Sequence, residues 1–341
     1  MAWIITTDLH LTANPLDEYR WGLFPFLNGK IKALGKGVHT LFVLGDLTQD
    51  KDRHPAVLVN RVVSSFVQLY RSTGLTRIIF LRGNHDGLGD VAFFEFLRCF
   101  SFMEVITLPC TRFIDLKQVA LLPHTKKPIQ DWATIEFSEV DYVLMHQTAA
   151  GAVAESGRKL EGDNLKWLGG YNARIYSGDI HVPQTIGNIR YVGAPYPIRF
   201  GDDFEGRVIC INGKKRLAWP FPTIRREKAV IKNIWELSSL GLREKDQLKV
   251  EFALDRSELY EWDNKRRMVE RWCDKHGVVL VGTTLHSKPV LRLKTNSRIA
   301  TKTPEDALKR YVNINKVEKP VVQVGTGLLQ KATEGHKQRT R

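Results

Sequence analysis

The chain has 341 residues, 43% of them hydrophobic, which suits one large folded domain or two smaller ones and excludes a disordered chain. Its formal net charge is +14, and the whole excess falls after residue 210: residues 1–210 carry 22 basic and 22 acidic side chains, whereas residues 211–341 carry 29 and 15. An excess confined to one part of a chain indicates a polyanionic partner, either nucleic acid or a membrane surface, unless it is only a solvated basic surface.

Two further features limit the class of protein. No apolar run approaches the ~20 residues needed to span a bilayer, and no basic segment precedes the apolar N-terminal residues, so we expect neither a membrane span nor a signal peptide. The four cysteines are scattered without a CxxC spacing, which argues against a disulfide framework and a zinc–thiolate site. We therefore expect a cytoplasmic protein.

The first two-thirds of the chain alternates short apolar runs with helical patterns. Six of these runs are rich in apolar residues typical of buried strands, and we predict strands at 3–6, 40–44, 77–81, 119–122, 142–145 and 173–177. A helix is predicted over residues 54–74, because apolar residues recur there at helical spacing between a proline and Gly74. This alternation indicates an α/β layered domain.

After residue 185 the pattern changes to consecutive β-strands, predicted at 189–193, 207–211 and 216–220. Two prolines and a basic cluster at 219–230 mark a domain boundary. Four elements are predicted beyond it, namely a strand at 247–254, a helix from about Ser257 to His276, a strand at 278–284 and a helix that begins near Thr303. Ser257 and Thr303 are the expected N-caps, and this part is predicted to be a small α+β domain.

Side chains that can bind metal ions follow five of the predicted strands. They are Asp8 and His10 in TTDLH, Asp46 in VLGDLTQD, Asn84, His85 and Asp86 in FLRGNHD, His146 in YVLMHQ, and Asp179 and His181 in IYSGDIH. Sites in α/β sheets are built at the carboxyl ends of strands, so we expect these groups to meet in one site. Asp, His and Asn without cysteine suit Mn, Fe, Mg or Zn, and there are enough of them for two cations. The neighbouring glycines, Gly45, Gly83 and Gly178, are expected to permit sharp turns.

The order of these motifs, D-x-H, G-D, G-N-H-D, a later H and G-x-x-H, resembles the calcineurin-like metallophosphoesterases over roughly residues 3–210. The resemblance implies an α/β fold, a four-layer αββα sandwich that carries a dinuclear metal site. By position in the motifs, Asp8, His10 and His181 would hold one cation, Asp46 would bridge, and Asn84, His146 and Asp179 would complete the second site. His85 would act at the scissile phosphate as a proton donor or charge stabiliser, and Asp86 would orient it.

The last motif departs from the family pattern. The family usually has G-H-x-H there, and this chain has Gly178-Asp179-Ile180-His181. An aspartate adds negative charge and favours hard cations, so we expect two Mn²⁺ ions, with Mg²⁺ as the second choice, in preference to zinc.

A second resemblance concerns residues 189–207, IRYVGAPYPIRFGDDFEGR, which are similar to the segment after the last metal motif of SbcD-like DNA repair nucleases. It implies a nuclease domain at 1–222, a smaller capping, DNA-binding α+β domain at 223–300, and a helix at 301–341 that binds an SbcC-like ATPase and ends in a basic tail. The length is similar to that of compact, phage-type members. Gln49 stands where those nucleases often have a histidine, which leaves the balance of endonuclease and exonuclease activity open.

The sequence is thus interpreted as a metal-dependent DNA nuclease subunit, a 3′→5′ exonuclease with some endonuclease activity. It is expected to act as a homodimer with an SbcC-like ATPase in DNA repair, recombination or replication, in the host cytoplasm if it is phage-encoded. Two alternatives stay open: a metal-dependent phosphatase or small-molecule phosphodiesterase, and a catalytically weak DNA-binding scaffold. The basic last third favours the nuclease over a small-molecule enzyme, because phosphate contacts dominate DNA affinity.

Overall fold

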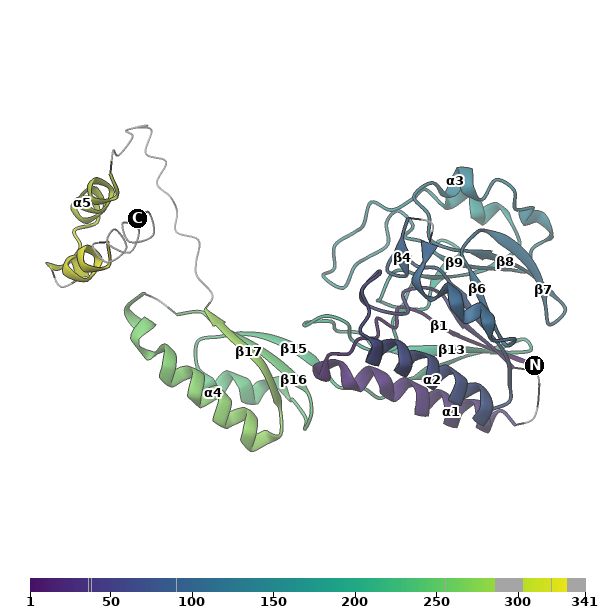
Figure 1. Ribbon diagram of the computed structural model, residues 1–341, viewed down its shortest axis with the longest axis horizontal. Coiled ribbons are helices and arrows are strands. Elements are labelled where there is room, and N and C mark those ends of the chain that lie inside the picture. Colours follow the sequence, from purple (N-terminus) through teal and green to yellow (C-terminus); the bar gives the residue numbers. More distant parts are fainter. Residues whose placement is uncertain are drawn as a thin grey trace. The chain divides into compact units, whose positions relative to one another are not determined.

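Two six-stranded sheets form the first part of the chain (Figure 1). The first sheet has the order β14-β13-β1-β2-β3-β6, in which β1, β2, β3 and β6 are parallel and β13 and β14 are antiparallel to their neighbours. The strands are β1 (Ala2–Thr6), β2 (His39–Val43), β3 (Leu75–Leu81), β6 (Met103–Ile106), β13 (Arg207–Asn212) and β14 (Lys215–Pro220). Because β1, β2 and β3 are parallel, their carboxyl ends lie at one edge of the sheet.

The second sheet has the order β11-β12-β10-β9-β8-β7. Its central strands β8, β9, β10 and β12 are parallel, and the outer strands β7 and β11 are antiparallel. The strands are β7 (Cys110–Ile114), β8 (Lys117–Leu122), β9 (Tyr142–His146), β10 (Arg174–Gly178), β11 (Gln184–Ile186) and β12 (Ile189–Tyr191). A two-stranded ribbon, β4 (Gly87–Leu88) with β5 (Val91–Ala92), follows β3.

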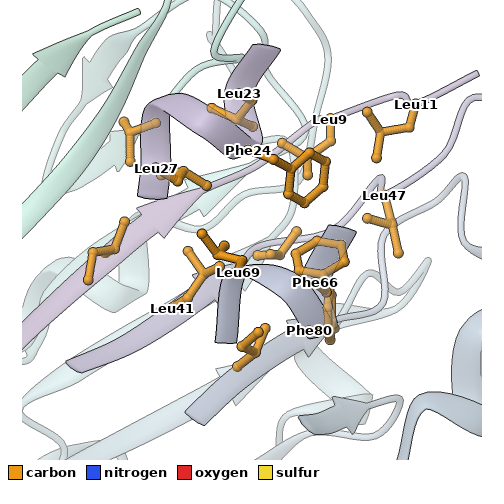
Figure 2. Close-up of a cluster of buried hydrophobic side chains, with 14 of the residues drawn as sticks. Leu9, Leu11, Leu23, Phe24, Leu27, Leu41, Leu47, Phe66, Leu69 and Phe80 are labelled. Carbon is orange, nitrogen blue, oxygen red and sulfur yellow. The ribbon is translucent and has the colours of Figure 1, made fainter. Parts of the chain in front are cut away.

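Successive residues of each buried strand face opposite sides, which is why these strands are apolar throughout. Ile4 of β1 packs with the helices, whereas Trp3 and Ile5 pack between the two sheets. On the helical side, α1 (Leu23–Ala33) and α2 (Ala56–Ser72) cover the first sheet. Figure 2 shows Phe24 and Leu27 of α1 and Phe66 and Leu69 of α2 directed toward Leu41 and Phe80 of the sheet.

The outer face of the second sheet is covered by short helices. These are α3 (Pro128–Asp131), η3 (Phe137–Glu139) and η4 (Lys166–Gly170), and they pack through Trp132, Phe137 and Leu168. The resulting layers, helices, sheet, sheet and short helices, confirm the predicted αββα sandwich.

Each of the six strands predicted in the first two-thirds is present, as β1, β2, β3, β8, β9 and β10, and the predicted helix is α2. Strands β6 and β7 were not predicted. Both lie at the edge of a sheet, and β7 has exposed residues on both faces, so neither has the continuous apolar pattern of a buried strand.

A third sheet of three strands contains β15 (Arg226–Ile231), β16 (Gln247–Phe252) and β17 (Val279–Leu285). It packs against η5 (Ile234–Leu240) and α4 (Trp262–His276), which η6 (Arg256–Glu261) precedes, and Leu237, Phe252 and Val269 lie in its buried cluster. All three strands are parallel, so this part has the strand–helix–strand order of an α/β unit instead of the expected α+β mixture.

The structure, a computed structural model, describes residues 1–35, 37, 39–89, 91–254, 256–285, 303–319 and 321–329.

Contacts divide the chain into two units, Met1–His286 and Ser287–Arg341. In the second unit α5 (Pro304–Asn315) begins as predicted, with the Thr303 side chain accepting a hydrogen bond from the Asp306 amide at 3.2 Å. The Ser257 side chain, the end of the expected capping domain at 286–300 and the basic tail lie outside the described residues. None of the described helices is both long and apolar enough to cross a membrane.

Candidate metal centre

Polar residues in the loops that follow β1 and β2, and the residue directly after β10, have an uncommon backbone conformation. Asp8, His10, Asp46 and Asp179 have φ angles of 52°, 42°, 54° and 76°. Non-glycine residues rarely adopt this left-handed region, and such residues cluster at functional sites. Hydrogen bonds from the Asp8 amide to the Gly45 carbonyl (3.0 Å) and from the His10 amide to the Asp46 carbonyl (2.9 Å) join the two loops and maintain this conformation.

Glycines beside the candidate ligands make room for them. Gly45 has a φ of 92°, as expected for a sharp turn. Gly83 has no positive φ, and its role is different: a Cβ atom there would overlap the carboxylate and amide of Asp46. A Cβ atom at Gly178 would likewise overlap Thr7. At Gly83 and Gly178, close packing and not the expected turn conformation requires glycine.

Asp8, His10 and His181 form the first group of candidate ligands. All three are buried, and one ligand atom from each lies within 4.8 Å of the others. The Nε2 atoms of His10 and His181 are 3.2 Å apart. Two imidazole nitrogens bound to one cation at ~2.1 Å and at about a right angle would be roughly 3 Å apart, so this pair fits a shared cation.

Asp8, Asp46 and His146 form the second group, again with ligand atoms within 4.8 Å. The two carboxylate oxygens of Asp46 face different histidines: Oδ2 lies 3.5 Å from His10 Nε2, and Oδ1 lies 3.5 Å from His146 Nε2. This is the arrangement expected of a bridging carboxylate. Asp8 belongs to both groups. The sequence interpretation assigned the bridge to Asp46 alone and did not predict this second shared residue.

The remaining expected ligands, Asn84 and Asp179, line the same cavity of about 370 Å³ as His10, Asp46 and His181. Asp179 Oδ1 lies 3.6 Å from His146 Nε2, and the other oxygen of Asp179 accepts a hydrogen bond from the Thr148 hydroxyl. The structure therefore brings all seven expected ligands together, from segments as far apart as residues 8 and 181.

Several of these groups are buried without a hydrogen-bond partner in the described part of the chain. They include Asp8 Oδ2, Asn84 Oδ1 and His146 Nε2. Buried polar atoms in proteins nearly always have a partner. Oxygen and imidazole nitrogen are donors that suit divalent cations, so the residues present fit such ions.

The pKa shifts reflect this crowding. Burial raises the pKa of Asp8 to about 6, against the lowering effect of the nearby histidines. For His146, burial alone would lower the pKa, but the carboxylates around it, led by Asp46 and Asp179, outweigh burial and raise the pKa to about 9. Several buried carboxylates at such distances need positive charge nearby, which bound cations would supply.

The contacts of His85 and Asp86 differ from the expected ones. His85 Nδ1 lies 2.7 Å from the backbone carbonyl of Gln49, so this carbonyl, and not Asp86, holds the ring. Asp86 instead accepts backbone hydrogen bonds from Gly83 (2.7 Å), Asp46 (2.8 Å) and Leu47 (2.8 Å). The prediction that Asp86 orients His85 is therefore corrected. The Asp86 carboxylate instead holds the loop that carries Asp46, because the turn after β3 brings Asp86 next to the loop after β2.

Residues 1–183 match the model of the calcineurin-like phosphoesterase family. The chain belongs to this family. The phosphoesterase is therefore a hydrolase that acts on phosphoester bonds, and the family uses divalent metal ions. The matched residues include every candidate ligand described above. None of the curated proteins matches the chain significantly.

Three residues around the centre of this phosphoesterase were not predicted. Glu155 Oε1 lies 2.7 Å from His181 Nδ1, Thr148 contacts Asp179, and the ring centroid of His124 lies 6.1 Å from that of His146. All three lie outside the five motifs. Their contacts depend on how the segments after β8 and β9 fold, for which the sequence contains no local signal.

Proposed function

We propose that this calcineurin-like phosphoesterase is an SbcD-like DNA nuclease subunit, a Mn²⁺-dependent 3′→5′ exonuclease that also has endonuclease activity. It would work as a homodimer with an SbcC-like ATPase in DNA repair, recombination or replication. The observation that carries the proposal is the position of the SbcD-like segment: its residues Ile198 and Arg199 line the same cavity as the candidate ligands. A motif similar to that of DNA nucleases thus borders the place where the phosphodiester would bind.

The candidate ligands divide between two cations in this proposal. Asp8, His10 and His181 would hold one, Asn84, His146 and Asp179 would hold the other, and Asp46 would bridge them with Asp8 alongside. Bound cations would supply an activated water and neutralise charge on the phosphate oxygens. Mn²⁺ is proposed ahead of Mg²⁺, because the donor set combines carboxylates with three imidazoles.

His85 would donate a proton to the leaving oxygen. Its Nδ1 is engaged by the Gln49 carbonyl, so Nε2 is the nitrogen that is available to the substrate. The His85 ring lines the cavity beside His10, with ring centroids 5.0 Å apart. Gln49 replaces the histidine often found in these nucleases, but the contact to His85 comes from the backbone and does not depend on that side chain.

Arg199 would bind a phosphate of the DNA. The described residues that line the cavity include three acids, Asp46, Glu155 and Asp179, and Arg199 is the one Lys or Arg side chain among them. A guanidinium group recognises phosphate oxygens through two parallel hydrogen bonds. We therefore assign Arg199 the role of holding the anionic backbone next to the cations.

The C-terminal part would contact the other partners. In the proposal, residues 223–300 cap the nuclease domain and bind DNA, and residues 301–341 bind the ATPase. The described helical residues of the second unit expose large apolar side chains at helical spacing, namely Tyr311, Ile314, Val321, Val324 and Leu328. No residue of α5 is buried, so an amphipathic helix here has an apolar face available to a partner.

Cleavage assays test the proposal directly. The full chain with Mn²⁺ is incubated in parallel with an end-labelled DNA duplex and with p-nitrophenyl phosphate. His146→Ala, prepared identically, controls for contaminating nucleases. We expect wild-type protein to shorten the duplex from its 3′ ends, and neither EDTA-treated protein nor the variant to do so.

The same assay separates the alternatives. Hydrolysis of the small ester without cleavage of DNA would replace the nuclease by a phosphatase or small-molecule phosphodiesterase. Binding of DNA without turnover by any divalent cation would indicate the catalytically weak scaffold. For the ATPase, Ile314→Asp is expected to abolish co-purification with an SbcC-like ATPase while leaving cleavage of short duplexes unchanged.

A further inference from the structure

The segment between β9 and β10 folds back on itself and carries Glu155 to the candidate metal centre. The Ala154 amide donates to the Arg158 carbonyl and the Gly157 amide donates to the Ala154 carbonyl, both at 2.9 Å. These bonds close a tight turn that contains Glu155, and they restrict the backbone from which its side chain projects.

Gln184 fixes this turn to the strand that follows His181. Its side-chain amide forms two hydrogen bonds with the backbone of Val153: the Val153 amide donates to Oε1 at 2.9 Å, and Nε2 donates to the Val153 carbonyl at 2.7 Å. Gln184 lies three residues after His181, and Val153 lies two residues before Glu155. The segments that carry the two side chains are thus held together independently of the Glu155–His181 contact.

Glu155 and His181 meet at short range in a largely buried place. Glu155 Oε1 lies 2.7 Å from His181 Nδ1, and the two side chains are 14% and 10% exposed. The pair is a close charge contact and not an aligned hydrogen bond, and the carboxylate favours a proton on Nδ1, which leaves the lone pair of the imidazole on Nε2. Nε2 is the atom that faces His10 Nε2 at 3.2 Å, where the first cation would bind.

We infer that Glu155 is a positioning residue for one of the two cations, the one assigned to Asp8, His10 and His181, because it fixes the orientation and tautomer of the His181 ring. The inference rests on the proposed metal assignment and adds to it a residue outside the family motifs. The other site does not depend on Glu155, because His146 Nδ1 lies 2.5 Å from a backbone carbonyl, that of Leu44. Removing the partner of a metal-bound histidine typically lowers metal affinity about 10–100-fold.

Mn²⁺ titration of the full chain tests the inference without any activity measurement. Binding is followed by isothermal titration calorimetry and by the loss of the free Mn²⁺ signal in electron paramagnetic resonance. The variants are Glu155→Ala, which removes the carboxylate, Glu155→Gln, which keeps an oxygen acceptor at the same place, and Glu161→Ala as the control. Glu161 is an exposed acid in the same segment, so its removal changes the net charge equally.

The expected result is selective. Wild type and Glu161→Ala bind two Mn²⁺ ions, and Glu155→Ala binds one of them about 10–100-fold more weakly while the other is unchanged within a few-fold. Glu155→Gln stays closer to wild type than Glu155→Ala, because its amide oxygen can still accept the Nδ1 proton. Equal melting temperatures in EDTA establish that every variant is folded.

Three outcomes would overturn the inference. In the first, Glu155→Ala binds both ions as tightly as wild type. In the second, it weakens both sites equally, which would mean a general electrostatic effect. In the third, Glu155→Gln is as weak as Glu155→Ala, which would mean that charge and not orientation matters. Failure of wild type to bind Mn²⁺ at all is a different result, because it contradicts the metal assignment of the proposed function itself.

Discussion

His146 and His181 belong to the two halves of the candidate metal centre, and the protein holds them in different ways. His146 is fully buried at the end of β9, and its Nδ1 contacts the backbone carbonyl of Leu44. His181 is held by the side chain of Glu155. A backbone partner survives any substitution that preserves the fold, whereas a side-chain partner is lost by a single substitution. The half with His146 should therefore resist mutation, and the half with His181 should be adjustable.

The largest expected effect comes from Asp46, which faces both halves. Asp46→Asn removes the charge that lies 3.5 Å from both His10 and His146, so both cations should be lost together and activity should fall to background. The measurement is metal content after dialysis against Mn²⁺, together with hydrolysis of a phosphodiester. If Asp46→Asn keeps near wild-type rates, Asp46 does not bridge the halves.

Substitution of His85 should lower the reaction rate without changing metal binding in either half of the centre. His85→Ala removes the proposed proton donor, and loss of a general acid typically lowers the rate about 10²–10⁴-fold. Metal content should stay at the wild-type level, because the His85 side chain bonds to a backbone carbonyl and is not one of the candidate ligands. A large loss of bound Mn²⁺ in this variant would make His85 part of the metal centre.

The stability of the metal-free protein should depend on pH through His146. The pKa of His146 is raised to about 9. Its contribution to stability is therefore complete below the unfolded pKa near 6.5 and is lost as the pH rises through 9. The free energy of unfolding in EDTA should therefore fall by about 1–3 kcal/mol between pH 6.5 and 9. Urea unfolding at several pH values measures this, and His146→Gln should give a flatter profile. A wild-type profile as flat as that of the variant would contradict the shift.

The smallest expected effect concerns Thr148, the side-chain partner of Asp179. Thr148→Val removes one hydrogen bond from a candidate ligand that other contacts still hold. A single hydrogen bond contributes about 1 kcal/mol, so Mn²⁺ affinity at the site with His146 should fall by roughly 5-fold. Calorimetric titration is sensitive to this change. A loss as large as that expected for Glu155→Ala would remove the difference between the halves.

Much of the fold follows from the sequence, because buried parallel strands and amphipathic helices have simple periodic patterns. The six strands of the central α/β region and helix α2 could be predicted for this reason. The edge strand β7 could not, because exposed residues on both of its faces give it a mixed pattern, although the edge strand β14 was predicted at 216–220. The parallel order of β15, β16 and β17 was also not predictable, since strand direction depends on crossovers and not on composition.

The candidate site was predictable for a related reason. Its seven candidate ligands lie at strand ends or within a few residues after them, so the position of each strand end indicates where the side chain lies. The residues around the ligands follow no such rule. Glu155 reaches His181 through a turn pinned by Gln184, and His85 is held by a carbonyl that is the same for any residue at position 49. Contacts of this kind become visible only in three dimensions.

The left-handed backbone at Asp8, His10, Asp46 and Asp179 has a consequence for how such a protein can change over time. Each of these positions favours glycine by about 1 kcal/mol, yet glycine has no side chain to offer a cation. Selection for catalysis and selection for a robust fold therefore act in opposite directions at all four. In a duplicate of this gene that is no longer under selection for catalysis, we expect substitutions to glycine at these four positions first.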